Sequence, residues 1–76
     1  MEITIDYEEV MSSRVDKNYR LLVGKKEIEV EVNKWWFEGF YNDSDNDYTI
    51  IDEDKIKKQL SEKEYDNLLD YINELN

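Results

Sequence analysis

The side chains of this chain that are best suited to chemistry are carboxylates repeated at every second position. Two such series occur, and their members are Glu27, Glu29 and Glu31 in the first and Asp43, Asp45 and Asp47 in the second. Alternate residues of an extended strand point to the same face, so each series predicts a row of negative charge. Such a row binds cations, either a metal ion or the lysine and arginine side chains of a basic partner.

The residues that the sequence lacks argue against catalysis. Neither histidine nor cysteine occurs among the 76 residues. Histidine is the usual general base near neutral pH, and nucleophile pairs such as Ser-His and Cys-His are excluded without it. A chain of this length also has little room for a cleft that excludes water. We therefore predict a protein that is not an enzyme and that has no catalytic residue, no cofactor and no metal site.

Residues 43–54 resemble the calcium-binding loop of the EF-hand family. Acidic side chains lie at loop positions 1, 3, 5 and 12, as that loop requires. Two positions depart from the family pattern, because Tyr48 replaces the glycine of the sharp turn and Asp54 replaces the bidentate glutamate. The preceding residues predict a strand where an EF-hand has a helix. We therefore interpret the segment as a solvated acidic hairpin loop.

An aromatic cluster precedes this acidic segment. Residues 35–54 contain seven acidic residues and no basic one, and the cluster begins with Trp35, Trp36 and Phe37. Neighbouring residues of a strand point to opposite faces, so Trp36, with Phe40, is predicted to lie in the core. Trp35 and Phe37 are then predicted to form an exposed contact site beside the acidic loop. The alternative is that Trp35 is an ordinary, half-exposed surface ring.

The strands that must position these residues have clear patterns. Segments 19–23 and 26–32 flank Gly24-Lys25, which suits a two-residue type II′ turn. Pairing Val23 with Lys26 places the apolar residues on one face and the three glutamates on the other. Asn33-Lys34 interrupts the alternation before Trp35. Segment 48–51 is predicted to be a third strand that pairs with the run beginning at Trp35.

Helix signals lie at both ends of the chain. The run Asp6-Tyr7-Glu8-Glu9 matches a capping box and predicts a helix over residues 7–14, although Ile3 and Ile5 alternate as in a strand. Asp52 is predicted to cap a short helix that ends near Leu60. A second capping box at residues 61–64 begins the last helix. Its apolar stripe is Tyr65, Leu68, Leu69, Ile72 and Leu75, and Tyr71 lies off the stripe and is predicted to be exposed.

Together these elements predict a single α+β domain over residues 1–76. It consists of a small three-stranded antiparallel sheet that is covered on one face by the C-terminal helices, with a short N-terminal helix or strand. The core is expected to be small, because 76 residues is close to the lower size limit for an independently folded domain.

The charge of the chain restricts its partners. Twenty acidic residues against ten basic ones leave a net charge of -10, which repels phosphate backbones and anionic membranes. Direct binding to nucleic acid or to a membrane is therefore not expected. Residues 1–4 show no basic region followed by an apolar run, and no apolar stretch approaches the roughly 20 residues that span a bilayer. A cytoplasmic location, in a bacterium or an infected host cell, is the expectation.

The sequence predicts a small acidic protein-binding inhibitor that imitates nucleic acid and occupies a basic channel on a nucleic-acid-handling partner. In size and charge the chain is similar to small phage-encoded inhibitors of bacterial defence, such as anti-CRISPR and anti-restriction DNA mimics. The residues predicted to bind the partner are Trp35, Phe37, Asp43, Asp45, Asp47, Glu27, Glu29 and Glu31. The alternative is a non-enzymatic interaction module or homodimer whose acidity only keeps it soluble.

Overall fold

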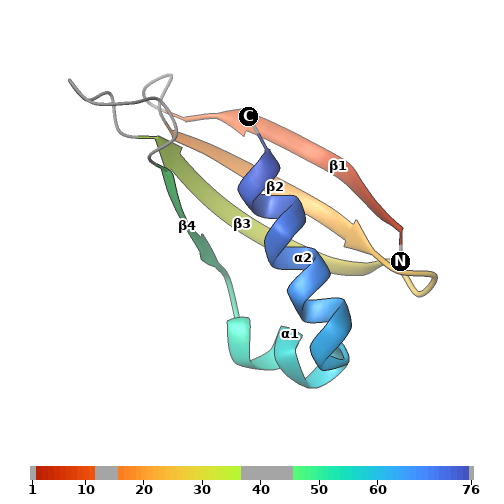
Figure 1. Cartoon of the computed structure of the whole chain (residues 1–76). Helices are drawn as coiled ribbons and strands as arrows, with labels where there is room; N and C mark the ends of the chain where they lie inside the picture. Colours follow the sequence, from red (N-terminus) through yellow and green to blue (C-terminus); the bar gives the residue numbers. More distant parts are fainter. Residues whose placement is uncertain (1, 12–15, 37–45, 76) are drawn as a thin grey trace.

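The computed structural model describes residues 2–11, 16–36 and 46–75, with the backbone alone described for residues 36, 46 and 47. The described chain forms a four-stranded antiparallel sheet in the order β1-β2-β3-β4, followed by two helices (Figure 1). The strands are β1 (Ile3–Val10), β2 (Asp16–Val23), β3 (Ile28–Trp36) and β4 (Asn46–Ile50), and the helices are α1 (Glu53–Gln59) and α2 (Glu62–Glu74). The α+β class and the two C-terminal helices are confirmed, and the sheet has one strand more than predicted.

The additional strand is β1, at the edge of the sheet. The helix predicted over residues 7–14 is wrong, and the other alternative, an N-terminal strand, is correct. A capping box is a local signal, whereas pairing with β2 gives the backbone of this segment its hydrogen-bond partners. The register shifts between Ile5 and Tyr7, so Asp6 is an extra residue that forms a β-bulge. The last part of the predicted helix lies outside the described residues.

The hairpin between β2 and β3 has a longer turn than predicted. Val23 pairs with Ile28 instead of Lys26, and residues 24–27 form the turn, with a hydrogen bond from Glu27 N to Gly24 O at 3.1 Å. Gly24 and Glu27 both have positive φ angles, of 75° and 52°. The register therefore differs by two residues from the predicted one. A shift of two keeps each side chain on its face, so the predicted apolar and acidic faces survive.

Helix α2 covers one face of the sheet and completes the core (Figure 1). The capping box that begins it is present, because Glu64 N donates to Ser61 Oγ and Ser61 N donates to Glu64 Oε1. Tyr71 is half-buried and packs against the core, so its predicted exposure is wrong. The buried apolar side chains come from three strands, both helices and the residue that follows α1, and are Tyr19, Leu21, Val23, Val30, Val32, Ile50, Ile56, Leu60, Leu68 and Ile72.

A lysine lies inside this core. Lys34 of β3 has an exposed fraction of 0 %, and its ammonium donates to Ile72 O at 2.5 Å and Leu75 O at 2.8 Å. The last carbonyl groups of a helix have no partner within the helix, and α2 has no basic residue in its own last turn. Lys34 therefore supplies the cation that the C-terminal end of α2 favours. Burial lowers the pKa of this ammonium.

Both helices of the described chain are short, since α1 has 7 residues and α2 has 13. Neither helix is long and apolar enough to cross a membrane.

Candidate partner-binding surface

The face of the sheet opposite α2 contains several of the predicted binding residues. We call this the open face, because neither α1 nor α2 covers it in the described chain (Figure 1). Its strand β3 contributes Glu29, Glu31, Asn33 and Trp35, which alternate with the core residues of the same strand. Glu29 and Glu31 are exposed, and Trp35 is partly buried. The structure thus places three predicted residues on one face of one strand.

The other predicted residues are distributed differently. Glu27 lies in the turn that precedes β3, so the predicted row of three glutamates contains only Glu29 and Glu31. The longer turn is the reason, because it takes up Lys26 and Glu27. Asp47 lies on β4 as the backbone partner of Trp35. Phe37, Asp43 and Asp45, together with Phe40, lie outside the described residues.

The centre of the open face is polar and internally hydrogen-bonded. The amide nitrogen of Asn33 donates to Asp16 Oδ1 at 2.8 Å and to Asn18 Oδ1 at 2.7 Å. Asp16 is also the β2 partner of Trp35, so this tryptophan has an aspartate as its backbone partner on each neighbouring strand. These hydrogen bonds hold Asn33, which lies between Trp35 and Glu31 along β3, against the side chains of β2.

The open face is less negatively charged toward β1, because Arg20 lies there. Its guanidinium donates to Asp6 Oδ2 at 2.8 Å and lies 5.4 Å from the centre of the Tyr7 ring. The hydrogen bond to Asp6 raises the pKa of Arg20, and the charges of Glu29 and Glu31 act in the same direction. Arg20 therefore offsets negative charge near β1. Arg20 is also the backbone partner of Glu31, so it offsets part of the charge of this glutamate as well. The other side of the open face, away from β1, lies near β3 and α1.

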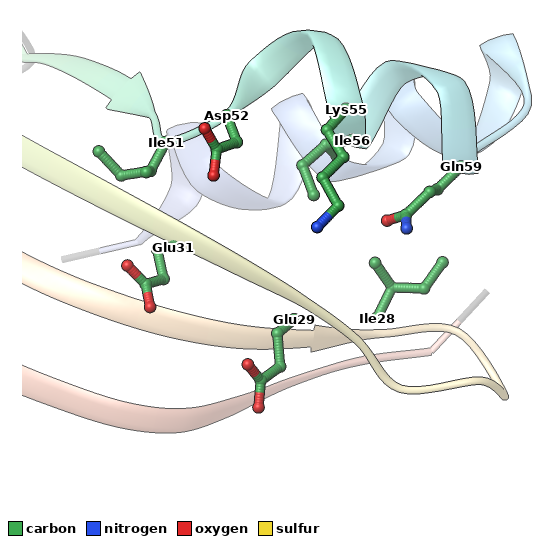
Figure 2. A pocket seen from close by; sticks show the side chains of 8 residues that line it. All are labelled: Ile28, Glu29, Glu31, Ile51, Asp52, Lys55, Ile56 and Gln59. Atoms are coloured by element: carbon green, nitrogen blue, oxygen red, sulfur yellow. The ribbon is translucent and has the colours of Figure 1, made fainter.

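At that side a hollow of about 330 Å³ lies between β3 and α1. Figure 2 shows Lys55 and Gln59 extending from α1 toward β3, while Glu29 and Glu31 project from β3 on the other side. Three carboxylates and one ammonium line the space, so it is net negative. Its complete lining is Ile28, Glu29, Glu31, Ile51, Asp52, Lys55, Ile56 and Gln59. The isoleucines give the hollow an apolar wall against which the methylene stem of a lysine or arginine can pack.

Asp52 is a residue of this hollow that sequence reasoning assigned to another role. It precedes α1, but its side chain makes no capping hydrogen bond, so the predicted cap is wrong. Its backbone is left-handed, with φ 56° and ψ 43°, which aspartate tolerates better than most residues. A helix cap instead has extended backbone angles, which aim the side chain at the first turn. Asp52 and Glu31 line the same hollow, because Ile51 N donates to Glu31 O at 2.9 Å and so joins the start of α1 to β3.

The same carboxylates do not form a metal site. Among the described residues no group of three or more acidic, histidine or cysteine side chains is arranged to hold a metal ion. The segment that resembles an EF-hand loop contains strand β4 in its described part, and strand β3 stands where the entering helix would be. The described geometry therefore suits a basic side chain better than calcium.

Comparison with protein-family models, curated proteins and solved structures finds no match for this chain.

Proposed function

We propose that the protein is a small acidic inhibitor that binds a nucleic-acid-handling partner through its open face and imitates the charge of nucleic acid. The observation that carries this proposal is the arrangement along β3, where Glu29 and Glu31 share one exposed face with Trp35. Carboxylates at this spacing meet basic side chains of the partner, and the aromatic ring supplies contact area. Phage inhibitors of bacterial defence are the class of protein in which this combination would be useful.

Charge supports the proposal in two ways. The net charge of -10 attracts a basic channel over a long range and accelerates the encounter. At close range, the hollow beside Glu29 and Glu31 offers an apolar wall and carboxylates to one lysine or arginine of the partner. Each well-formed charge pair of this kind contributes about 1.4 kcal/mol or more, which is a tenfold change in affinity.

The experiment that tests the proposal is capture of proteins on the immobilised chain, followed by elution with duplex DNA or RNA. Proteins that use one basic channel for the inhibitor and for nucleic acid are released by the nucleic acid. The double variant Glu29→Gln, Glu31→Gln removes two negative charges from the open face and should weaken capture at least about tenfold. Raising the salt concentration should weaken capture by the wild-type chain more than by this variant.

The matched control removes two negative charges elsewhere. Asp66 and Asp70 are exposed on α2, so Asp66→Asn, Asp70→Asn changes the net charge equally without altering the open face. Capture by this control should stay close to that of the wild-type chain. If both double variants weaken capture equally, only net charge matters and the open face is not the binding site. If neither has an effect and nucleic acid releases nothing, the acidity is only solubilising and the proposal fails.

A further inference from the structure

The hollow between β3 and α1 has groups that the proposed function does not use. It exists because β4 is short and pairs with β3 only from Val32 to Trp36, so in the described chain the first residues of β3 have no strand on that side. Helix α1 lies there instead and leaves a space of about 330 Å³. The hollow is therefore bounded by β3, by α1 and, where β4 ends, by Ile51.

One end of the hollow is suited to a cation. Glu31 and Asp52 lie at the end near Ile51, because Ile51 N donates to Glu31 O at 2.9 Å and Asp52 follows directly. Arg20 offsets part of the charge of Glu31, but it pairs from β2 and does not line the hollow. The side chain of Asp52 makes no hydrogen bond or ion pair with another described residue. Asp52 therefore keeps this end negative.

The other end of the hollow is suited to an anion. Lys55 and Gln59 share one face of α1 because they are one helical turn apart, and Figure 2 shows both extending toward β3 at the end where Ile28 lies. Neither side chain has a hydrogen-bond or ion-pair partner among the described residues. The N–H of Glu29 points away from β2, as the carbonyl of Glu31 does two residues later. An ammonium, an amide and a backbone N–H can therefore bind one carboxylate.

Apolar side chains line the hollow between these two ends. They are Ile28, Ile51 and Ile56, of which Ile51 is exposed and Ile56 is buried. Such a wall binds the methylene stem of a long side chain while its charged group stays at the polar end. The matching ligand therefore has a cation and a carboxylate that are separated by an aliphatic stem. A residue with an apolar side chain does not match, because it carries both charges on one carbon.

We infer that the hollow binds a basic residue with a free α-carboxylate, either the C-terminal lysine or arginine of a partner chain or the free amino acid. Its side-chain cation would lie at Glu31 and Asp52, its α-carboxylate at Lys55, and its stem against the isoleucines. The inference rests on the proposed function in one respect, because both place a basic side chain in this hollow. It adds the free carboxylate, which a lysine or arginine inside a chain lacks.

The test uses three small probes, with amide chemical shifts of the full chain as the readout. Nα-acetylarginine carries both charges, Nα-acetylargininamide lacks the carboxylate, and Nα-acetylcitrulline lacks the cation. The first should perturb residues 28–31 and 51–59 and bind about three- to tenfold more tightly than either of the others. Free arginine distinguishes the two sources, because tighter binding than Nα-acetylarginine identifies the free amino acid and weaker binding identifies a C-terminal residue.

Protein variants test the two ends of the hollow separately. Lys55→Gln should bind the acid and the amide probes equally, whereas Lys58→Gln, an exposed position of α1 outside the hollow, should keep the preference for the acid. Asp52→Asn should weaken both probes at least about threefold. Asparagine suits the left-handed backbone at this position, so the fold should be retained. Asp54→Asn is the matched control, because Asp54 does not line the hollow.

Three results overturn the inference. They are equal binding of the acid and amide probes to the wild-type chain, equal effects of Lys55→Gln and Lys58→Gln, and no binding at millimolar concentration. If nucleic acid releases captured proteins but the acid and amide probes bind equally, the proposed function stands and the inference fails. If the acid probe binds through Lys55 but nucleic acid releases nothing, the inference stands and the proposed function fails.

Discussion

The buried ammonium of Lys34 gives the most informative stability experiment. The substitution Lys34→Met keeps most of the side-chain volume and removes the charge and both hydrogen bonds to the end of α2. Each hydrogen bond from a charged group contributes about 1.5–3 kcal/mol, and removing the ammonium from water offsets part of this. We expect a net loss of about 2 kcal/mol, which is a large share of the roughly 4–11 kcal/mol expected for 76 residues.

Thermal and urea unfolding followed by circular dichroism measure this loss. A decrease of about 2 kcal/mol corresponds to a fall in Tm of about 8–16 °C for a domain of this size. Lys25→Met is the matched control, because Lys25 lies exposed in the turn before β3 and should change stability by less than about 0.5 kcal/mol. If Lys34→Met is as stable as the wild-type chain or more so, the ammonium does not stabilise α2 and the reasoning is refuted.

Three further predictions concern other elements of the fold. Burial, followed by the charge of Glu8, raises the pKa of Tyr19 to about 12 from an ordinary 10.0. The folded state therefore keeps the full contribution of neutral Tyr19 below pH 10, and the free energy of unfolding falls by about 2–3 kcal/mol as the pH rises toward 12. In urea unfolding, Tyr19→Phe should lose less stability over this pH range than the wild-type chain. Ser61→Ala removes the capping box of α2 and should cost about 1 kcal/mol, measured by urea unfolding, with no change if the box is unimportant. Gly24 has a φ of 75° and open space around its Cα, so Gly24→Ala should cost about 1 kcal/mol through backbone strain alone, and a stabilised variant would contradict that reading.

The β2-β3 hairpin shows how much of the fold the sequence could predict. The alternation of apolar and acidic residues correctly predicted which face each side chain occupies. The turn is longer than predicted, but it shifts the register by two residues, and a shift of two leaves every side chain on its predicted face. The exact length of a turn depends on small energy differences between backbone conformations. Glu27 adopts a left-handed backbone conformation, which its residue type does not predict. For that reason the prediction that Glu27 shares a row with Glu29 and Glu31 is wrong.

Lys34 and Asp52 are two residues whose roles local sequence patterns did not predict. The sequence suggested that Asn33-Lys34 interrupts the alternation, yet Lys34 occupies a core-facing position of β3 and donates to Ile72 O of α2, 38 residues along the chain. Asp52 had the residue type and position of a helix cap, but its side chain contributes to the hollow beside β3. In both cases the role is set by contact with an element far away in the sequence, which no local pattern encodes.

The bulge at Asp6 affects how relatives of this protein should be sought. On the N-terminal side of the bulge, Ile3 and Ile5 face α2, whereas beyond it Glu8 and Val10 occupy that side. The inward positions of β1 therefore change from odd to even numbers within one strand. A protein with the same fold but without the extra residue would have its apolar positions one place out of phase with these. Searches for such a protein should allow a one-residue gap at Asp6, because an ungapped comparison would align inward residues with outward ones.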